Sequence, residues 1–223
     1  MHVLVPAKNT SIAKSRLAIL LSPNERAALA LAMLRDVLTA LSKVKAVHDV
    51  HVVTDDAVIR RIGNEFGAHT IEDKHMGDLN AALRQARSQL QRDGALNCAV
   101  LAADLPLVTA RDLEILFDQH HDAPSVTTAP AHDEGGTNGL VLSPIDIIDF
   151  QFGPSSFEHH CEQAKIKNCK LEIVQNAGLE FDIDLPQDLN RLISITRGSN
   201  TAALISEMAD PLTKRRHVLG RAS

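Results

Sequence analysis

Residues 98–109 read CAVLAADLPLVT, and this stretch decides the fold class. It opens with six apolar residues in a row, which is typical of a strand buried on both faces of a parallel sheet. Asp104 follows at once, Pro106 turns the chain away, and Thr109 is placed to cap a following helix. A buried strand that ends in an aspartate and leads into a helix predicts one unit of an open α/β sheet.

The same alternation extends toward the N-terminus. Ser22-Pro23-Asn24-Glu25 is a capping box with proline at the first helical position, and it predicts a helix that runs to about Val44. The other elements expected before residue 98 are strands over 2–6, 50–54 and 68–72, and helices over 56–66 and 78–92. This order predicts a three-layer α/β/α architecture with a mostly parallel sheet and right-handed connections.

The second half of the chain departs from this regular order. A polar loop joins two expected strands, and residues 155–158 (SSFE) have the pattern of a second capping box. The elements expected here are strands over 125–130, 139–144, 171–174 and 180–183, and helices over 156–168 and 186–196. We expect one domain over residues 1–209 and a mobile tail over 210–223, since that end carries no apolar period.

Composition excludes several classes of protein. A net charge of -5 argues against a protein that coats nucleic acid, and no apolar run approaches the roughly 20 residues of a membrane span. Three cysteines without a CxxC pair indicate neither a disulfide framework nor a zinc site. The apolar start lacks a preceding basic region, so we expect a first strand and not a signal peptide. A cytoplasmic protein that acts on small molecules, with no nucleic-acid or membrane partner, fits these features.

Sheets of this class bind ligands beyond the C-terminal ends of their strands, and carboxylates lie at these positions in the sequence. Asp104 follows one buried strand, and Asp182 and Asp184 alternate in FDIDLPQDL (residues 181–189), so both point to one side. Neighbouring carboxylates repel unless a cation lies near them, and Mg²⁺ takes one or two carboxylates plus phosphate oxygens. The pattern predicts a magnesium site, with a turn role for Asp104 and a helix cap by Asp184 as the structural alternatives.

A basic loop, PAKNTSIAKSRL (residues 6–17), lies between the first strand and the first helix. It holds Lys8, Lys14 and Arg16 and contains no glycine, so it is neither a Walker loop nor a dinucleotide fingerprint. In those loops backbone amides bind the phosphates, and here cationic side chains would have to take over that role. The alternative is a solvated basic connection.

Two loops in the second half also have ligand-binding features. Gly135, Gly136 and Gly139 in DEGGTNGLVLSP (residues 133–144) permit close backbone approach, and Thr137 offers a hydroxyl. In FGPSSF (residues 152–157), Gly153 and Ser156 precede a helix, and a helix N-terminus favours anions. Asn80, at the start of an earlier helix, is a candidate contact for a base or ribose. Ordinary turns and a polar helix face are the alternatives.

Seven segments resemble, in order, the motifs of the CofC family of guanylyltransferases, over residues 1–196. They are VPAKNTSIAKSRL, VVTDD, DLNAAL, AADLPL, GGTNGL, FGPSSF and DIDLPQDL. The resemblance implies a glycosyltransferase-A-like nucleotidyltransferase fold. It also implies transfer of GMP from GTP to 2-phospho-L-lactate, phosphoenolpyruvate or 3-phospho-D-glycerate, with release of pyrophosphate, in coenzyme F420 biosynthesis.

The resemblance also implies roles for single residues. The triphosphate contacts would be Lys14 and Arg16, with Lys8 a weaker candidate, and Asn80 would contact the nucleoside. Asp104 and one or both of Asp182 and Asp184 would bind Mg²⁺, while Thr137, Gly153 and Ser156 would contact the acceptor acid. The family segment often has glycine where this chain has Ser155, so Ser155 is a candidate for narrowing or re-polarising the acceptor pocket. His132, just before the glycine loop, is another candidate for selecting the acceptor.

Alternative functions and an assembly remain open at this point. A molybdenum-cofactor or sugar-phosphate nucleotidyltransferase would keep the reaction and change the substrates, although a sugar transferase usually has a glycine-rich first loop. A non-catalytic nucleotide-binding module would bind GTP and form no product. Apolar residues after Gly139 fit either the core or the face of a homodimer: Val141, Leu142, Ile147, Ile148 and Phe150.

Overall fold

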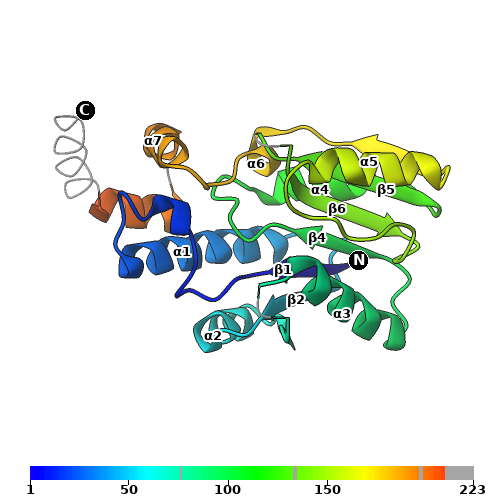
Figure 1. Ribbon diagram of the computed structural model, residues 1–223, viewed down its shortest axis with the longest axis horizontal. Coiled ribbons are helices and arrows are strands. Elements are labelled where there is room, and N and C mark those ends of the chain that lie inside the picture. Colours follow the sequence, from blue (N-terminus) through cyan, green and yellow to red (C-terminus); the bar gives the residue numbers. More distant parts are fainter. Residues whose placement is uncertain (76, 133–134, 196–197, 209–223) are drawn as a thin grey trace.

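A seven-stranded sheet forms the middle layer of the computed structural model, with strand order β3-β2-β1-β4-β6-β5-β7 (Figure 1). The structure describes residues 1–75, 77–132, 135–195 and 198–208. The strands are β1 (His2–Pro6), β2 (Asp49–Thr54), β3 (His69–Glu72), β4 (Cys98–Leu101), β5 (Ser125–Pro130), β6 (Thr137–Ser143) and β7 (Lys170–Ile173). The helices are α1 (Pro23–Leu41), α2 (Ala57–Glu65), α3 (Leu79–Arg92), α4 (Ala110–Asp118), α5 (Ser156–Ile166), α6 (Ala177–Glu180) and α7 (Pro186–Ile195), with a 3₁₀ turn η1 (Ser15–Leu17) and a further helical stretch over residues 200–208.

Strand direction explains where the ligand crevice lies. β1, β2, β3 and β4 are mutually parallel, whereas β6 runs antiparallel to both β4 and β5. The first residue of β6, Thr137, therefore lies at the edge where β4 and β5 end, opposite Pro130 in the register. Residues that follow β1, β2 and β4 share this edge with the start of β6, as the rule for open α/β sheets requires.

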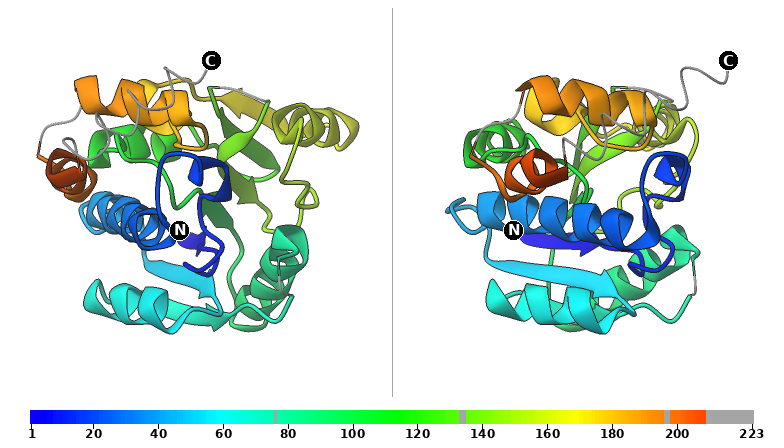
Figure 2. Two further views of the ribbon diagram at one scale, coloured as in Figure 1. Left: turned by 60° about the vertical axis from the view of Figure 1, so that its left-hand side comes forward. Right: turned by 90° about the vertical axis from the view of Figure 1, so that its left-hand side faces the viewer.

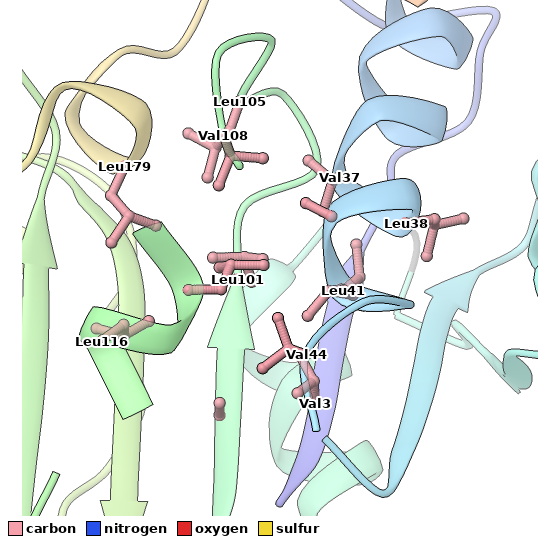
Figure 3. Packing of buried hydrophobic residues seen from close by; sticks show 14 of the residues in the cluster. Val3, Val37, Leu38, Leu41, Val44, Leu101, Leu105, Val108, Leu116 and Leu179 are labelled. Atoms are coloured by element: carbon pink, nitrogen blue, oxygen red, sulfur yellow. The ribbon is translucent and has the colours of Figure 1, made fainter. Parts of the chain in front are cut away.

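Helices cover both faces of the sheet (Figure 2). On one face, Val3 and Leu101 pack against α1, α2 and α4, and Figure 3 shows Val37, Leu41 and Leu116 of these helices around the two strands. On the other face, Leu4 and neighbouring strand residues pack against α3 and α5. The sequence prediction of a mostly parallel sheet in a three-layer α/β/α architecture is confirmed.

A third apolar cluster lies beside the N-terminal half of α1, where α7 and the helical stretch 200–208 pack against it (Figures 1 and 2). Asp36 of α1 anchors this stretch, because its carboxylate accepts hydrogen bonds from the backbone and side chains of Asn200 and Thr201. This helix is not among the elements expected from the sequence. The predicted tail, 210–223, lies outside the described residues.

Most predicted elements are present, including the capping box at Ser22 and the helix cap at Thr109, which is a capping box with Asp112. The strand predicted over 180–183 is wrong: residues 177–180 form α6, and the chain then runs on without sheet pairing. Phe181 and Ile183 are buried in the third apolar cluster instead of pairing with a strand. Their burial sends the alternating Asp182 and Asp184 toward the crevice.

The capping box predicted at Ser155 is also wrong. Ser155 has a left-handed backbone conformation (φ 56°), and its side chain makes no capping hydrogen bond. The first amides of α5 are used differently, because the N–H of Ser156 donates to Gly153 and the N–H of Phe157 donates to Gly135. Docking of the two glycine-containing loops against each other has replaced the local cap.

The apolar residues after Gly139 belong to the core. Val141, Leu142, Ile148 and Phe150 are buried, so they do not provide an exposed dimer face. Among the described residues, no helix is both long and apolar enough to span a membrane.

Candidate active site

The basic loop after β1 is held in place by Asp56, the N-cap of α2. One carboxylate oxygen of Asp56 accepts the N–H and hydroxyl of Thr10 at 2.8 and 2.6 Å, and the other accepts the N–H of Val58 at 2.7 Å. Burial raises the pKa of Asp56, but these hydrogen bonds outweigh it and lower the pKa below its ordinary value. The loop is therefore fixed by an ionised side chain at the end of the neighbouring strand.

Lys14 reaches from this loop into the acidic segments. Its backbone is left-handed (φ 50°), and its ammonium contacts Asp104 and lies 3.0 Å from Asp184. The side chain is only 8% exposed, and burial on its own lowers the pKa of Lys14. The two carboxylates reverse that effect and raise the pKa above its ordinary value, so the ammonium stays charged.

Three carboxylates converge around this ammonium. Ligand oxygens of Asp104, Asp182 and Asp184 all lie within 4.8 Å of one another, although the residues are far apart in the chain. Burial and the charge of Asp104 raise the pKa of Asp182 to about 6. Burial also acts to raise the pKa of Asp184, but Lys14 and Arg16 lower it. Burial is the largest cause of the raised pKa of Asp182, and the charges of Asp104 and Asp184 add to it. An all-oxygen set of this kind suits a hard dication.

Asp188 leaves Asp184 available to the cluster. Its carboxylate, in the first turn of α7, accepts the N–H of Asp184 and of Leu185, at 3.1 and 2.7 Å, just before the helix begins. The carboxylate of Asp184 contacts Lys14, and a cap of α7 by Asp184 stays a structural alternative. The Nε2 atom of His132 lies 3.4 Å from Asp188, and its Nδ1 lies 3.4 Å from Asp182, so this imidazole stands behind the carboxylates.

A cleft of about 370 Å³ lies in front of the carboxylates. Six of the residues selected from the sequence line it: Lys8, Lys14, Arg16, Asp104, Thr137 and Asp184. The guanidinium of Arg16 lies 3.7 Å from Asp184. Asp73 and Gly77 also line the cleft, and neither is among the candidates selected from the sequence. Asp73 directly follows β3, so the rule that selected Asp104 after β4 also applies to it.

The Thr137 hydroxyl is part of a buried network beneath the cleft. The N–H of Gln151 donates to Nε2 of His160 at 3.2 Å, which requires the proton of the neutral ring to be on Nδ1. That Nδ1 lies 3.1 Å from the Thr137 hydroxyl oxygen, and the Ser156 hydroxyl donates to the same oxygen at 3.2 Å. Thr137 therefore accepts two hydrogen bonds. Its own proton has no acceptor among the described residues and is available to a ligand in the cleft that it lines.

The remaining predicted residues support the cleft without lining it. The side-chain amide of Asn80 donates to the carbonyl oxygen of Phe152 at 2.9 Å and accepts the N–H of Phe152 at 2.7 Å. These two hydrogen bonds fix the FGPSSF loop to the start of α3. Gly153 has φ 130°, which favours glycine, and Ser156 is buried beneath Thr137. A nucleoside contact by Asn80 and direct acceptor contacts by Gly153, Ser156 and His132 stay predictions.

Solved structures with a similar fold include a nucleotidyl transferase and a cytidylyltransferase. A crystal structure from Desulfovibrio desulfuricans G20 superposes with a TM-score of 0.75, at 19% identity over 96% of this chain and 97% of that chain. A nucleotidyl transferase from Methanothermobacter superposes with a TM-score of 0.59, at 15% identity over 86% of this chain and 94% of that chain. These similarities show the fold, which is of the glycosyltransferase-A-like type.

Sequence relatives are closer. A phosphoenolpyruvate guanylyltransferase of Roseiflexus castenholzii is 40% identical over 189 residues, which is 85% of this chain and 86% of the relative. A 2-phospho-L-lactate guanylyltransferase of Methanocaldococcus sp. FS406-22 is 35% identical over 193 residues, which is 86% of this chain and 81% of the relative. Residues 1–209 match the family model described as guanylyl transferase CofC like. The chain belongs to the CofC-like guanylyl transferase family.

Proposed function

We propose that this protein transfers GMP from GTP to a phosphorylated three-carbon acid and releases pyrophosphate, as a step in coenzyme F420 biosynthesis. The acceptor is 2-phospho-L-lactate, phosphoenolpyruvate or 3-phospho-D-glycerate. Relatives named for the first two acids support the substrate class. The observation that carries the proposal is the convergence of Lys14 with Asp104, Asp182 and Asp184 at one end of the cleft.

The proposed chemistry is an in-line displacement at the α-phosphorus of GTP. A phosphate oxygen of the acceptor forms the new bond, the bond to the bridging oxygen between the α- and β-phosphates breaks, and pyrophosphate leaves with that electron pair. An acceptor phosphate is already ionised near neutral pH, so the reaction needs no general base. This matches a cleft that presents cations and carboxylates. Lys14 and Arg16 would bind and neutralise the triphosphate, and Lys8 of the same loop would be a weaker contact.

The three aspartates would hold Mg²⁺. Their oxygen donors match the preference of this ion, and the negative charges of Asp104 and Asp184, which add to burial in raising the pKa of Asp182, favour a cation there. When bound, the ion supplies charge neutralisation to the phosphates. Lys14 would exchange part of its contact with Asp104 and Asp184 for contact with the nucleotide phosphates.

The acceptor would lie at the Thr137 side of the cleft. The Thr137 hydroxyl is held as a hydrogen-bond donor by His160 and Ser156, and a donor suits a carboxylate or phosphate. The neighbouring loop around Gly153 is fixed by Asn80 through Phe152. These contacts support an anionic acceptor.

The decisive experiment measures pyrophosphate release and product mass with GTP, Mg²⁺ and each of the three acids in turn. Asp104→Ala is expected to abolish release while the circular dichroism spectrum stays unchanged. Asp118→Ala, an exposed aspartate on α4, is the matched control and should keep full activity. Turnover retained by a folded Asp104→Ala protein would refute the role of the carboxylates. GTP binding without product from any acid would instead favour a non-catalytic module.

A further inference from the structure

A cluster of histidines lies near the starts of β1, β2 and β3, at the opposite end of these strands from the cleft. His2 begins β1, His51 lies in β2 and His69 begins β3. Because side chains alternate along a strand, these three share a face with Leu4, Val53 and Ile71, which all pack on the α3 side. The register places Asp49 beside His2 and His69 beside His51. Three neighbouring strands therefore bring three imidazoles and one carboxylate together.

The distances in this cluster are those of a small ligand set. Ligand atoms of His2, Asp49 and His51 all lie within 4.8 Å of one another. One oxygen of Asp49 lies 3.4 Å from Nδ1 of His2, and its other oxygen lies 3.5 Å from Nε2 of His69. The rings of His51 and His69 are stacked, with centroids 5.2 Å apart. His69 thus contacts the carboxylate from the side away from His2, where an outer partner of a metal ligand is commonly found.

Two ring nitrogens in the cluster lack the partners that buried polar atoms normally have. His2 Nδ1 and His51 Nε2 are both buried, and neither has a hydrogen-bond partner within the described part of the chain. An imidazole nitrogen without a hydrogen-bond partner is free to bind a metal ion through its lone pair.

We propose that His2, Asp49 and His51 form a binding site for a borderline divalent transition metal, with Zn²⁺ as the reference ion and His69 as the outer partner that orients Asp49. Two imidazoles and one carboxylate are common zinc ligands at about 2.0–2.2 Å, and a fourth position can be taken by water. Imidazole donors also distinguish this site from the all-oxygen carboxylate cluster in the cleft, which suits a harder ion. A bound ion would link the first residues of β1 and β2.

Isothermal titration of Zn²⁺ into untagged, EDTA-stripped protein tests the site, with excess Mg²⁺ present to occupy the cleft. The wild type is expected to bind about one Zn²⁺ tightly, and thermal denaturation should shift upward with added Zn²⁺. His51→Gln and Asp49→Asn should weaken binding by more than the roughly 10- to 100-fold that loss of an outer partner costs. His69→Gln should fall within that range.

Two controls separate this site from other histidines and from the cleft. His159→Gln, an exposed residue on α5, should bind Zn²⁺ like the wild type. Asp104→Ala should also keep the tight Zn²⁺ site. Equal affinity in the wild type, His51→Gln and Asp49→Asn would overturn the proposal, as would absence of tight Zn²⁺ uptake by the wild type. Asp49 is partly exposed, so its variant keeps the test valid should His51→Gln fail to fold.

Discussion

Replacement of His160 should weaken binding of the acceptor acid without affecting GTP. His160 is fully buried, with Nδ1 facing the Thr137 hydroxyl and Nε2 accepting the N–H of Gln151. His160→Phe keeps an aromatic ring and removes both hydrogen bonds. His160→Asn is the matched variant, because its side-chain amide can donate from nearly the position of Nδ1 and so keep the Thr137 proton directed into the cleft.

The magnitude follows from the hydrogen bonds involved. A hydrogen bond to a charged group contributes about 1.5–3 kcal/mol, and about 1.4 kcal/mol is a factor of ten. Thr137→Val removes the donor itself, so the KM for the acid should rise about 10- to 150-fold. His160→Phe removes only the group that orients the donor, which is one neutral hydrogen bond of about 1 kcal/mol, so the KM should rise about fivefold.

The assay is steady-state pyrophosphate release, with the acid varied at saturating GTP and then GTP varied at saturating acid. His160→Phe should raise only the KM for the acid, and His160→Asn should restore most of the loss. His160→Phe also leaves the Gln151 amide unpaired at a cost of about 1–3 kcal/mol, so rates are compared well below the unfolding temperature. Equal increases in both KM values, or equal losses in the two variants, would show that His160 has no role beyond packing.

Three further outcomes are expected. Lys14→Met should lower kcat by about 100-fold or more, because the triphosphate loses a cationic contact. The same variant should bind Mg²⁺ at least as tightly as the wild type in isothermal titration, because the carboxylates lose their internal counter-ion; weaker Mg²⁺ binding would contradict this. Burial, reinforced by His159, lowers the pKa of His160 to about 4, so the unfolded chain takes up the proton first as the pH falls. His51 and His120, whose pKa values burial also lowers to about 4, act in the same direction in both proteins. The fall in the free energy of unfolding between about pH 7.5 and pH 5, measured with urea, should therefore be about 2 kcal/mol smaller in His160→Asn than in the wild type. Asp36→Asn should lower the free energy of unfolding by about 2–3 kcal/mol, because the buried hydrogen bonds to residues 200–201 are charge-assisted. The control Asp118→Asn, at an exposed position, should lower it by about 0.5 kcal/mol or less.

Local patterns in the sequence were sufficient for much of the fold and part of the site. The apolar run before Asp104 predicted a buried strand, because burial on both faces demands such a run wherever it lies in the chain. The rule that ligands bind beyond strand ends then placed Asp104 and the loop of Lys14 at one edge. The alternation of Asp182 and Asp184 also predicted their common side, although the segment is not part of the sheet.

Features that depend on distant partners were not predictable from local patterns. The sequence around Ser155 has the letters of a capping box, but docking of the loop against Gly135 gives the amides of α5 other acceptors. His160 looks like any helical histidine until its contacts with Thr137 and Gln151 are known. The position of the Lys14 ammonium likewise depends on Asp104 and Asp184, which lie 90 and 170 residues away in the sequence.

The ammonium of Lys14 makes the ligand-free protein carry its own counter-ion. A cluster of three carboxylates with nothing between them would store electrostatic repulsion and oppose folding, whereas here a lysine from the same chain relieves it. In the proposed reaction, Mg²⁺ that arrives with the nucleotide would take over from Lys14 as the counter-ion of the carboxylates, and Lys14 would return to them after the products leave. The cleft would thus keep its carboxylates neutralised between turnovers even when metal and nucleotide are scarce.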